Sequence, residues 1–152
     1  MKKLYFLIFS SIVFLDAFSK QLAIKYLSNE EISVFPGCNL DLSFNSGISF
    51  SLFKDYSFMI LTLIIGAIII LFGIYTLGEY VKGVNVTPEV FVLAGGFSNL
   101  LNRFTYKGVI DFIDLYVGNY HWPTFNIADV FIMLGIFFIM IRSWQDAYRA
   151  KN

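Results

Sequence analysis

Two acidic side chains, Asp111 and Asp129, have the residue type and surroundings of a catalytic carboxylate pair. Asp111 lies in the segment VIDFID and Asp129 in FNIAD, and no Lys or Arg is close to Asp129 in the sequence to neutralise it. Two carboxyl groups held close together cannot both ionise, so one keeps a proton while its neighbour stays anionic. The anion can then accept a proton from water, and the protonated partner can donate to a carbonyl oxygen. From the spacing alone, Asp114 could take the place of Asp111 as the partner of Asp129 in the pair.

Other polar residues form stripes on segments that are otherwise apolar. Helical spacing would place each set on one face: Asp16 and Lys20; Gly95, Asn99, Asn102 and Arg103; Asn126 and Asp129. Because an ionisable group inside a membrane costs at least about 2.5–3.5 kcal/mol, such stripes predict a functional interior. Structural roles remain open for them. Asp16 and Lys20 could form a simple helical ion pair, Arg103 could extend to the membrane interface, and Asn99 could join two helices.

The composition of the chain is that of a membrane protein. Of its 152 residues, 57% are hydrophobic and 14% are charged, whereas a soluble domain averages about 45–50% apolar and about 25% charged residues. Eleven basic residues balance eleven acidic ones, which gives no electrostatic reason to bind nucleic acid. The single cysteine, Cys38, excludes an internal disulfide and a metal cage built from cysteines.

Four segments are predicted as membrane-spanning helices, each of which needs roughly 20 mainly apolar residues. They are 4–27, 56–77, 88–104 and 126–145, and together they form one domain over residues 1–152. If the N-terminus lies in the cytoplasm, the helix ends and loops on the cytoplasmic side carry more Lys and Arg residues than those on the outer side. This distribution predicts an N-in, C-in topology. The polar stripes then lie in the outer halves of their helices.

A small β element is predicted over 33–53, in the first outer segment. Apolar and polar residues alternate over 39–44 and again over 48–52, a pattern typical of half-buried strands. Asn45-Ser46-Gly47 between them predicts the turn of a β-hairpin, in which Gly47 supplies a positive φ. The second outer segment, 105–125, is predicted as a loop between the third and fourth helices. Its His121 suits the membrane interface better than a metal site, because the chain has no second histidine.

Five motifs follow one another along the chain: DAFSK (16–20), FNSGISF (44–50), GGFSNLLNR (95–103), VIDFID (109–114) and FNIAD (125–129). This series resembles the lipoprotein signal peptidases, or type II signal peptidases, and covers essentially the whole chain. The resemblance implies an all-α membrane protein with four transmembrane helices, a small outer β element and the activity of an aspartic protease.

The resemblance also implies roles for individual residues. Asp111 and Asp129 would be the catalytic pair, which selects Asp111 over Asp114. Eight further residues would line or support the site: Asp16, Lys20, Asn45, Gly47, Asn99, Arg103, Asn126 and Ala128. One position departs from the usual family pattern, because Asn102 stands where an Asp commonly precedes the arginine. We expect this change to alter the local support of Arg103 and to leave catalysis intact.

The implied reaction is removal of the signal peptide from a prolipoprotein whose cysteine carries a diacylglyceryl group, by cleavage immediately before that cysteine. The reaction would need no metal or cofactor. Expected partners are these prolipoproteins, membrane lipids and globomycin-type inhibitors. The protein would be a monomer in the bacterial cytoplasmic membrane, with its site on the extracytoplasmic side. A different class, a small membrane transporter or proton-pathway subunit, would use the same intramembrane charges as a relay.

Overall fold

The computed structural model describes residues 2–28, 30–47, 56–106 and 108–151. Within these ranges the helices are α1 (Lys2–Leu27), α2 (Tyr56–Val81), α3 (Thr87–Tyr106) and α4 (Ile127–Arg149). The strands are β1 (Ile32–Phe35), β2 (Cys38–Asn45), β3 (Val109–Val117) and β4 (Tyr120–His121). They form one antiparallel sheet in the order β1-β2-β3-β4.

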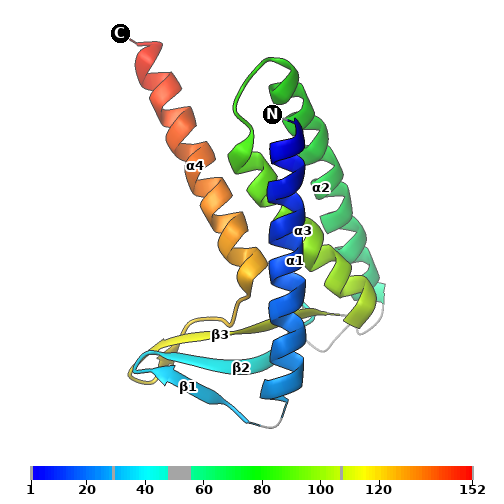
Figure 1. The fold of residues 1–152 in the computed structure, drawn as a ribbon, viewed down its shortest axis with the longest axis vertical. Coiled ribbons are helices and arrows are strands. Elements are labelled where there is room, and N and C mark those ends of the chain that lie inside the picture. The colour runs from blue at the N-terminus through cyan, green and yellow to red at the C-terminus, as the bar shows by residue number, and fades with distance from the viewer. Residues whose placement is uncertain (1, 29, 48–55, 107, 152) are drawn as a thin grey trace.

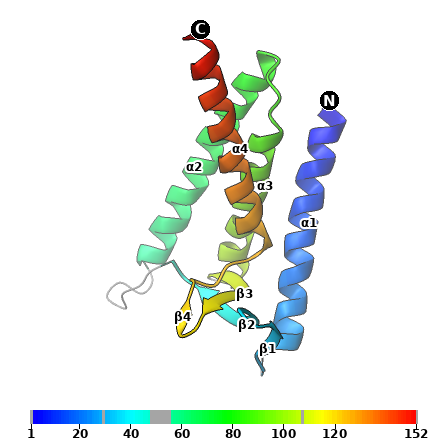
Figure 2. The same ribbon diagram turned by 90° about the vertical axis from the view of Figure 1, so that its left-hand side faces the viewer.

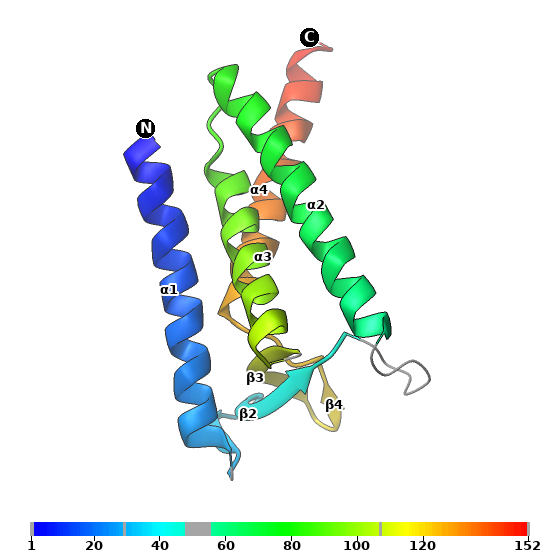
Figure 3. The same ribbon diagram turned by 90° about the vertical axis from the view of Figure 1, so that its right-hand side faces the viewer.

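The helices stand side by side, and the sheet lies across one end of them, opposite the two chain termini (Figure 1). Helix α3 is central and packs against α1, α2 and α4. Figure 3 shows α3 between α1 and α2, and Figure 2 shows β3 and β4 at the end of the bundle where α4 begins. Two glycines allow the close approach of α3 and α4: a Cβ on Gly95 would lie 2.5 Å from the Ala128 carbonyl oxygen, and one on Gly135 would lie 2.5 Å from that of Pro88.

Among the described residues, three helices are long and apolar enough to cross a membrane, and they are α1, α2 and α4. Their outward side chains are large and apolar, for example Phe6 on α1, Leu71 on α2 and Met140 on α4. Helix α3 is not among the three. Four of its polar residues are buried: Glu89, Ser98, Asn102 and Arg103. A helix surrounded by other helices faces little lipid and does not need an apolar surface.

The sheet is larger than the sequence patterns indicated. The segment 105–125, predicted as a loop, contains β3 and β4, so that prediction is wrong. The first four residues of β3, from Val109 to Phe112, are all buried. A strand covered on both faces has no alternation of apolar and polar residues by which to recognise it.

The first outer segment contains a hairpin that the sequence patterns did not predict. Strand β2 pairs with β1 through a turn at Pro36-Gly37, where Gly37 has φ +99°, and its other neighbour is β3. The predicted second strand, 48–52, lies outside the described residues. Gly47 does have the positive φ expected of it, +73°.

A small apolar core joins the end of α1 to the sheet. It consists of Ala23 and Leu27 from α1 together with Ile110 and Phe112 from β3. Helix α3 is tied to the same strand, because the Ile110 backbone N–H donates to the Asn102 side-chain oxygen at 3.2 Å. The residue between Ile110 and Phe112 is Asp111, so this packing fixes the position of one predicted catalytic residue.

Candidate active site

The N-terminus of α4 holds Asp129 in place. Asn126 is the N-cap residue, and its side-chain oxygen accepts the Asp129 backbone N–H at 3.0 Å. In return, Asp129 Oδ2 accepts the backbone N–H of Asn126 at 3.1 Å. This reciprocal pair is a capping box, which satisfies two of the N–H groups that a helix start leaves without partners. The Asp129 carboxylate is therefore fixed on the first turn of the helix.

Asn126 also contacts the other predicted catalytic residue. Its side-chain nitrogen donates to Asp111 Oδ1 at 2.6 Å, and the Asn126 side chain is fully buried. One asparagine thus makes hydrogen bonds to Asp111 and to Asp129, which brings together residues that are far apart in the sequence. Both acids predicted from the sequence meet at this point.

A second asparagine holds the other oxygen of Asp111. Asn45, at the end of β2, donates from its side-chain nitrogen to Asp111 Oδ2 at 2.9 Å. The Asn45 side-chain oxygen accepts the Gly47 backbone N–H at 2.8 Å, which orients the amide. Burial raises the pKa of Asp111 above its ordinary value, and the negative charge of Asp129 acts in the same direction, while hydrogen bonds from Asn45 and Asn126 oppose the rise. Asp111 therefore keeps a proton to higher pH than a free aspartate.

Asp16 and Lys20 form an ion pair within α1, and Asp16 also makes hydrogen bonds to two other helices. Their charged atoms are 2.7 Å apart, and both side chains are buried. Asp16 also accepts a hydrogen bond from Ser98 Oγ on α3 at 2.6 Å and one from the Ala128 backbone N–H on α4 at 2.8 Å. The pair therefore joins α1 to α3 and α4, which is more than the simple helical pair left open by the sequence.

Two hydrogen bonds through Asn99 connect Lys20 to Asp129. Lys20 Nζ donates to the Asn99 side-chain oxygen at 2.7 Å, and the Asn99 nitrogen donates to Asp129 Oδ1 at 2.8 Å. Both oxygens of Asp129 thus have donors. Ala128 enters the site through its backbone N–H, and its side chain is fully buried. Ser98 also belongs to the site, although it was not among the predicted residues. Its position as a polar residue within the GGFSNLLNR motif could have indicated this role.

Arg103 and Gly47 lie beside the acids on the β2 side. The Arg103 guanidinium donates to the Ser46 carbonyl oxygen at 3.2 Å and stands 5.8 Å from the ring centroid of Phe58. A Cβ on Gly47 would lie 2.8 Å from Arg103 Nη2. Glycine suits this position for two reasons: it adopts the positive φ easily, and its lack of a Cβ leaves space for the Arg103 side chain.

Asp114, the alternative acid, has a different partner. Residues 111 and 114 have opposite parity on β3 and so point to opposite faces of the sheet. Asp114 Oδ2 lies 2.8 Å from His121 Nδ1, and the His121 ring stacks on Tyr116 with centroids 5.1 Å apart. The structure brings Asp111 to Asn126 and Asp129, and it brings Asp114 to His121. Within the described residues, no group of three or more His, Cys, Asp or Glu could hold a metal ion.

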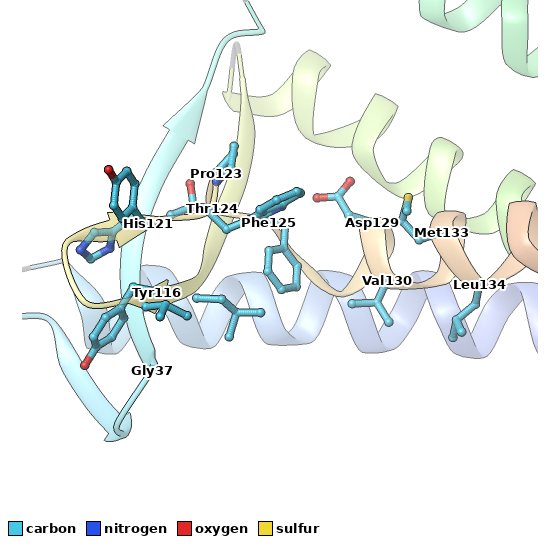
Figure 4. A pocket seen from close by; sticks show the side chains of 14 residues that line it. Gly37, Tyr116, His121, Pro123, Thr124, Phe125, Asp129, Val130, Met133 and Leu134 are labelled. Carbon is cyan, nitrogen blue, oxygen red and sulfur yellow. The ribbon is translucent and has the colours of Figure 1, made fainter.

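Two cavities open beside the acids. The larger, about 1100 Å³, lies between α4 and the segment of β3 and β4, and Asp129 is part of its wall (Figure 4). The smaller, about 400 Å³, is lined by Asn45 and Gly47 among others. Pro123 and Thr124 line both cavities. Asp129 can therefore be reached from the apolar cavity, while the polar cavity contacts Asn45, which binds Asp111.

The fold and the site together define a membrane protein with buried, hydrogen-bonded carboxylates at one end of its helices. Residues 8–145 match the family model described as signal peptidase (SPase) II. A lipoprotein signal peptidase of Blochmanniella pennsylvanica is 40% identical over 124 residues, which cover 77% of this chain and 73% of that protein. One from Syntrophus aciditrophicus is 36% identical over 154 residues, with 93% and 94% covered. The chain belongs to the signal peptidase II family and is a protease.

Solved structures agree with this fold. A bacterial membrane enzyme determined by the in meso method at 1.9 Å resolution superposes with a TM-score of 0.79 at 22% identity, covering 95% of this chain and 94% of that one. A second, at 2.3 Å resolution, gives a TM-score of 0.75. The resemblance seen in the sequence motifs is confirmed, and membership of a peptidase family argues against the transporter alternative.

Proposed function

We propose that this protein is an aspartic endopeptidase in which Asp111 and Asp129 activate a water molecule. The observation that supports this most directly is the position of Asn126, which makes hydrogen bonds to both carboxyl groups. The raised pKa of Asp111 favours a pair of carboxyl groups that shares one proton. Asn45 and Asn99 bind the remaining carboxylate oxygens and hold the pair in position.

The proposed reaction follows from one ionised and one protonated carboxyl group. The ionised group accepts a proton from water as the water oxygen attacks the carbonyl carbon, and the protonated group donates to the carbonyl oxygen. The tetrahedral intermediate then collapses. Its C–N bond breaks as the leaving nitrogen takes a proton from the pair. One hydroxyl of the intermediate returns a proton to the pair as the C=O bond forms, so a carboxylic acid, an amine and the original protonation state result. No covalent intermediate with the protein forms.

The proposed substrates are prolipoproteins with a diacylglyceryl-modified cysteine, cleaved immediately before that cysteine. The relatives' name, lipoprotein signal peptidase, supports this substrate class. A globomycin-type inhibitor would compete with the substrate for the site. We expect the protein to act as a monomer with membrane lipids around it.

We further propose that α3 is a fourth membrane-spanning helix and that both termini lie in the cytoplasm of a bacterial cell. Lys2, Lys3, Arg149 and Lys151 belong to the end of the bundle that carries the termini. This distribution supports an N-in orientation. The sheet and the carboxylates would then lie on the extracytoplasmic side of the cytoplasmic membrane.

A cleavage assay with three variants tests the catalytic assignment. Purified protein in detergent micelles should cleave a diacylated prolipoprotein, and Asp111→Asn or Asp129→Asn should abolish cleavage while the thermal unfolding transition remains cooperative. Asp114→Asn is the matched control, because Asp114 is a buried acid on the same strand with a different partner. Activity in both Asp111→Asn and Asp129→Asn would refute the pair, and inactivity of Asp114→Asn alone would reverse the choice between the two acids.

A further inference from the structure

The two ends of the helix bundle differ in charge. At the end that carries both chain termini (Figure 1), four exposed cations form no ion pair within residues 2–28, 30–47, 56–106 and 108–151: Lys2, Lys3, Arg149 and Lys151. At the end that carries the sheet, the exposed Lys and acidic residues of the described chain are Lys25, Glu30, Glu31 and Asp41. The terminal end therefore has an excess of exposed positive charge, and the sheet end has an excess of exposed negative charge.

The outward face of α4 changes in character toward the terminal end. Phe137, Trp144 and Lys151 are seven positions apart and so share one face of the helix. Ala150, the C-cap residue, keeps a helical backbone with φ −71° and ψ −16°, which continues this spacing to Lys151. The rings of Trp144 and Tyr148 stack with centroids 6.1 Å apart, and Phe137, Trp144 and Tyr148 are all more than half exposed. This face is thus apolar first, then aromatic, then cationic.

This order matches the layers of a lipid bilayer. Apolar side chains contact the hydrocarbon, Trp and Tyr favour the headgroup boundary, and long cationic side chains extend to the charged surface. From Ile127, where α4 begins, to Trp144 the rise is about 26 Å at 1.5 Å per residue. The hydrocarbon core of a bilayer is about 30 Å thick. With the start of α4 near one boundary of this core, the stacked Trp144 and Tyr148 lie near the other.

The charges near this face favour an anionic lipid over a zwitterionic one. Asp146 lies two positions from Trp144 and from Tyr148, so it is on a different face of α4. Arg142 is already paired with the buried Glu89 of α3. The face that presents Trp144 and Tyr148 therefore ends in a cation without an acid beside it. A zwitterionic headgroup would bring its own cation to this surface, whereas an anionic headgroup would not.

We propose that this face of α4 binds an anionic phospholipid. Its headgroup lies against Lys151 and Arg149, and its glycerol region lies against the stacked Trp144 and Tyr148. Lys2 and Lys3, at the start of α1, add positive charge at the same bilayer surface. The bound lipid anchors the end of α4 opposite the one that carries the carboxylates. The inference concerns a different part of the molecule from the candidate active site and needs no assumption about catalysis.

The two tryptophans of the chain provide a comparison between the ends. Trp144 is 68% exposed at the terminal end, and Trp122 is 71% exposed at the sheet end. The full-length variant Trp122→Phe keeps Trp144 as its sole tryptophan, and Trp144→Phe keeps Trp122. Each variant is reconstituted in mixed bilayers of phosphatidylglycerol and phosphatidylcholine, in which either lipid carries bromine near the headgroup. Quenching of fluorescence by each brominated lipid gives the relative affinity of the two lipids beside that tryptophan.

With Trp144 as the reporter, we expect phosphatidylglycerol to bind about fivefold more tightly than phosphatidylcholine. This ratio corresponds to roughly 1 kcal/mol, the contribution of one juxtamembrane Lys or Arg. Adding Arg149→Gln and Lys151→Gln should remove most of the preference. Lys25→Gln is the matched control, because it removes an exposed cation at the sheet end and should leave the preference unchanged. High salt should weaken the preference, since the charges are exposed. With Trp122 as the reporter, phosphatidylglycerol should have no advantage.

Three outcomes would overturn the inference. Equal quenching of Trp144 by both lipids would leave Arg149 and Lys151 with a role at the helix dipole only, because cations also stabilise a helix C-terminus. A preference that survives the loss of both cations would place the lipid elsewhere. An equal preference at Trp122 would show a general attraction to the protein and no site on α4. Since none of these measurements involves cleavage, the proposed function would stand in each case and is tested separately by the cleavage assay.

Discussion

Replacing Asp16 by Asn should destabilise the protein far more than the loss of an ordinary helical ion pair. The side chain of Asp16 is completely buried and that of Lys20 is 1% exposed. The amide of Asn can still accept the Ala128 backbone N–H, so the main change is the loss of one negative charge. Lys20 would lose its direct ion-pair partner and remain a buried cation, with Asp129 only indirectly linked to it through Asn99.

The magnitude follows from this burial. Breaking a buried ion pair by removing one partner costs about 3–5 kcal/mol. For a chain of this length, each kcal/mol lowers the unfolding midpoint by about 2–4 °C, so Asp16→Asn should lower it by about 6–20 °C. Glu79→Gln is the matched control. Glu79 pairs with Lys82 at 2.8 Å on the same kind of helical spacing, but the Lys82 side chain is 70% exposed, so this variant should behave like the wild type.

Thermal unfolding in detergent, followed by tryptophan fluorescence, measures the effect. The double variant Asp16→Asn/Lys20→Met should recover most of the lost stability, because no unpaired charge remains. It should not recover full activity, since Lys20 also binds Asn99, which holds Asp129. If Asp16→Asn shifted the midpoint no more than Glu79→Gln, the pair would be an exposed helical pair and the reasoning from burial would be wrong.

Three further predictions concern the same site. Asn126→Ala should lower the free energy of unfolding by about 1 kcal/mol through the lost N-cap, and it should also abolish cleavage. Asn126→Ser should restore the N-cap but not the activity. The unfolding midpoint and kcat measure the two effects separately. The pKa of Asp111 is raised in the folded protein. Below pH 3.8 the acid is protonated in both the folded and the unfolded state, so its ionisation does not change the free energy of unfolding. As pH rises through the folded-state pKa, ionisation of Asp111 increasingly destabilises the folded protein. The midpoint of Asp111→Asn minus that of the wild type should therefore increase with pH over this window, and a constant difference would contradict the shift. Gly95→Ala should destabilise the protein by about 1–3 kcal/mol, because the added Cβ would lie 2.5 Å from the Ala128 carbonyl oxygen. Gly96→Ala should be tolerated, because its Cβ would lie 3.4 Å from the nearest atom, a side-chain carbon.

The parts of the site on helices could be predicted from the sequence. Ionisable and amide residues within apolar segments have few stable surroundings other than one another. The stripes that contain Asp16, Asn99 and Asn126 accordingly converge in the structure. Helical periodicity also places each residue on the correct face, so the sequence alone outlines the hydrogen-bonded interior.

The strand that carries Asp111 could not be predicted in the same way. Residues Val109 to Phe112 are buried on both sides, so no alternation marks the strand. Spacing alone also could not choose between Asp111 and Asp114. The phase of β3 gives the two acids different surroundings, because it directs Asp111 toward Asn126 and Asp114 toward His121. The partners of β2 depend on a distant strand and on a turn at Gly37, neither of which local alternation indicates.

The start of α4 explains how so many acidic groups are tolerated together. A helix N-terminus has unpaired N–H groups and about half a positive charge, which favours carboxylates beside it. Asp129 binds the Asn126 N–H and Asp16 binds the Ala128 N–H, so two acids from different helices share this one terminus. Lys20 supplies the remaining positive charge beside Asp16. Among the described residues, Asp111 reaches this terminus through the Asn126 side chain and not through a backbone N–H. Asp111 therefore depends on two neutral side-chain amides, Asn126 and Asn45, and only Asn126 also caps α4, which is why Asn126 variants should separate helix capping from catalysis.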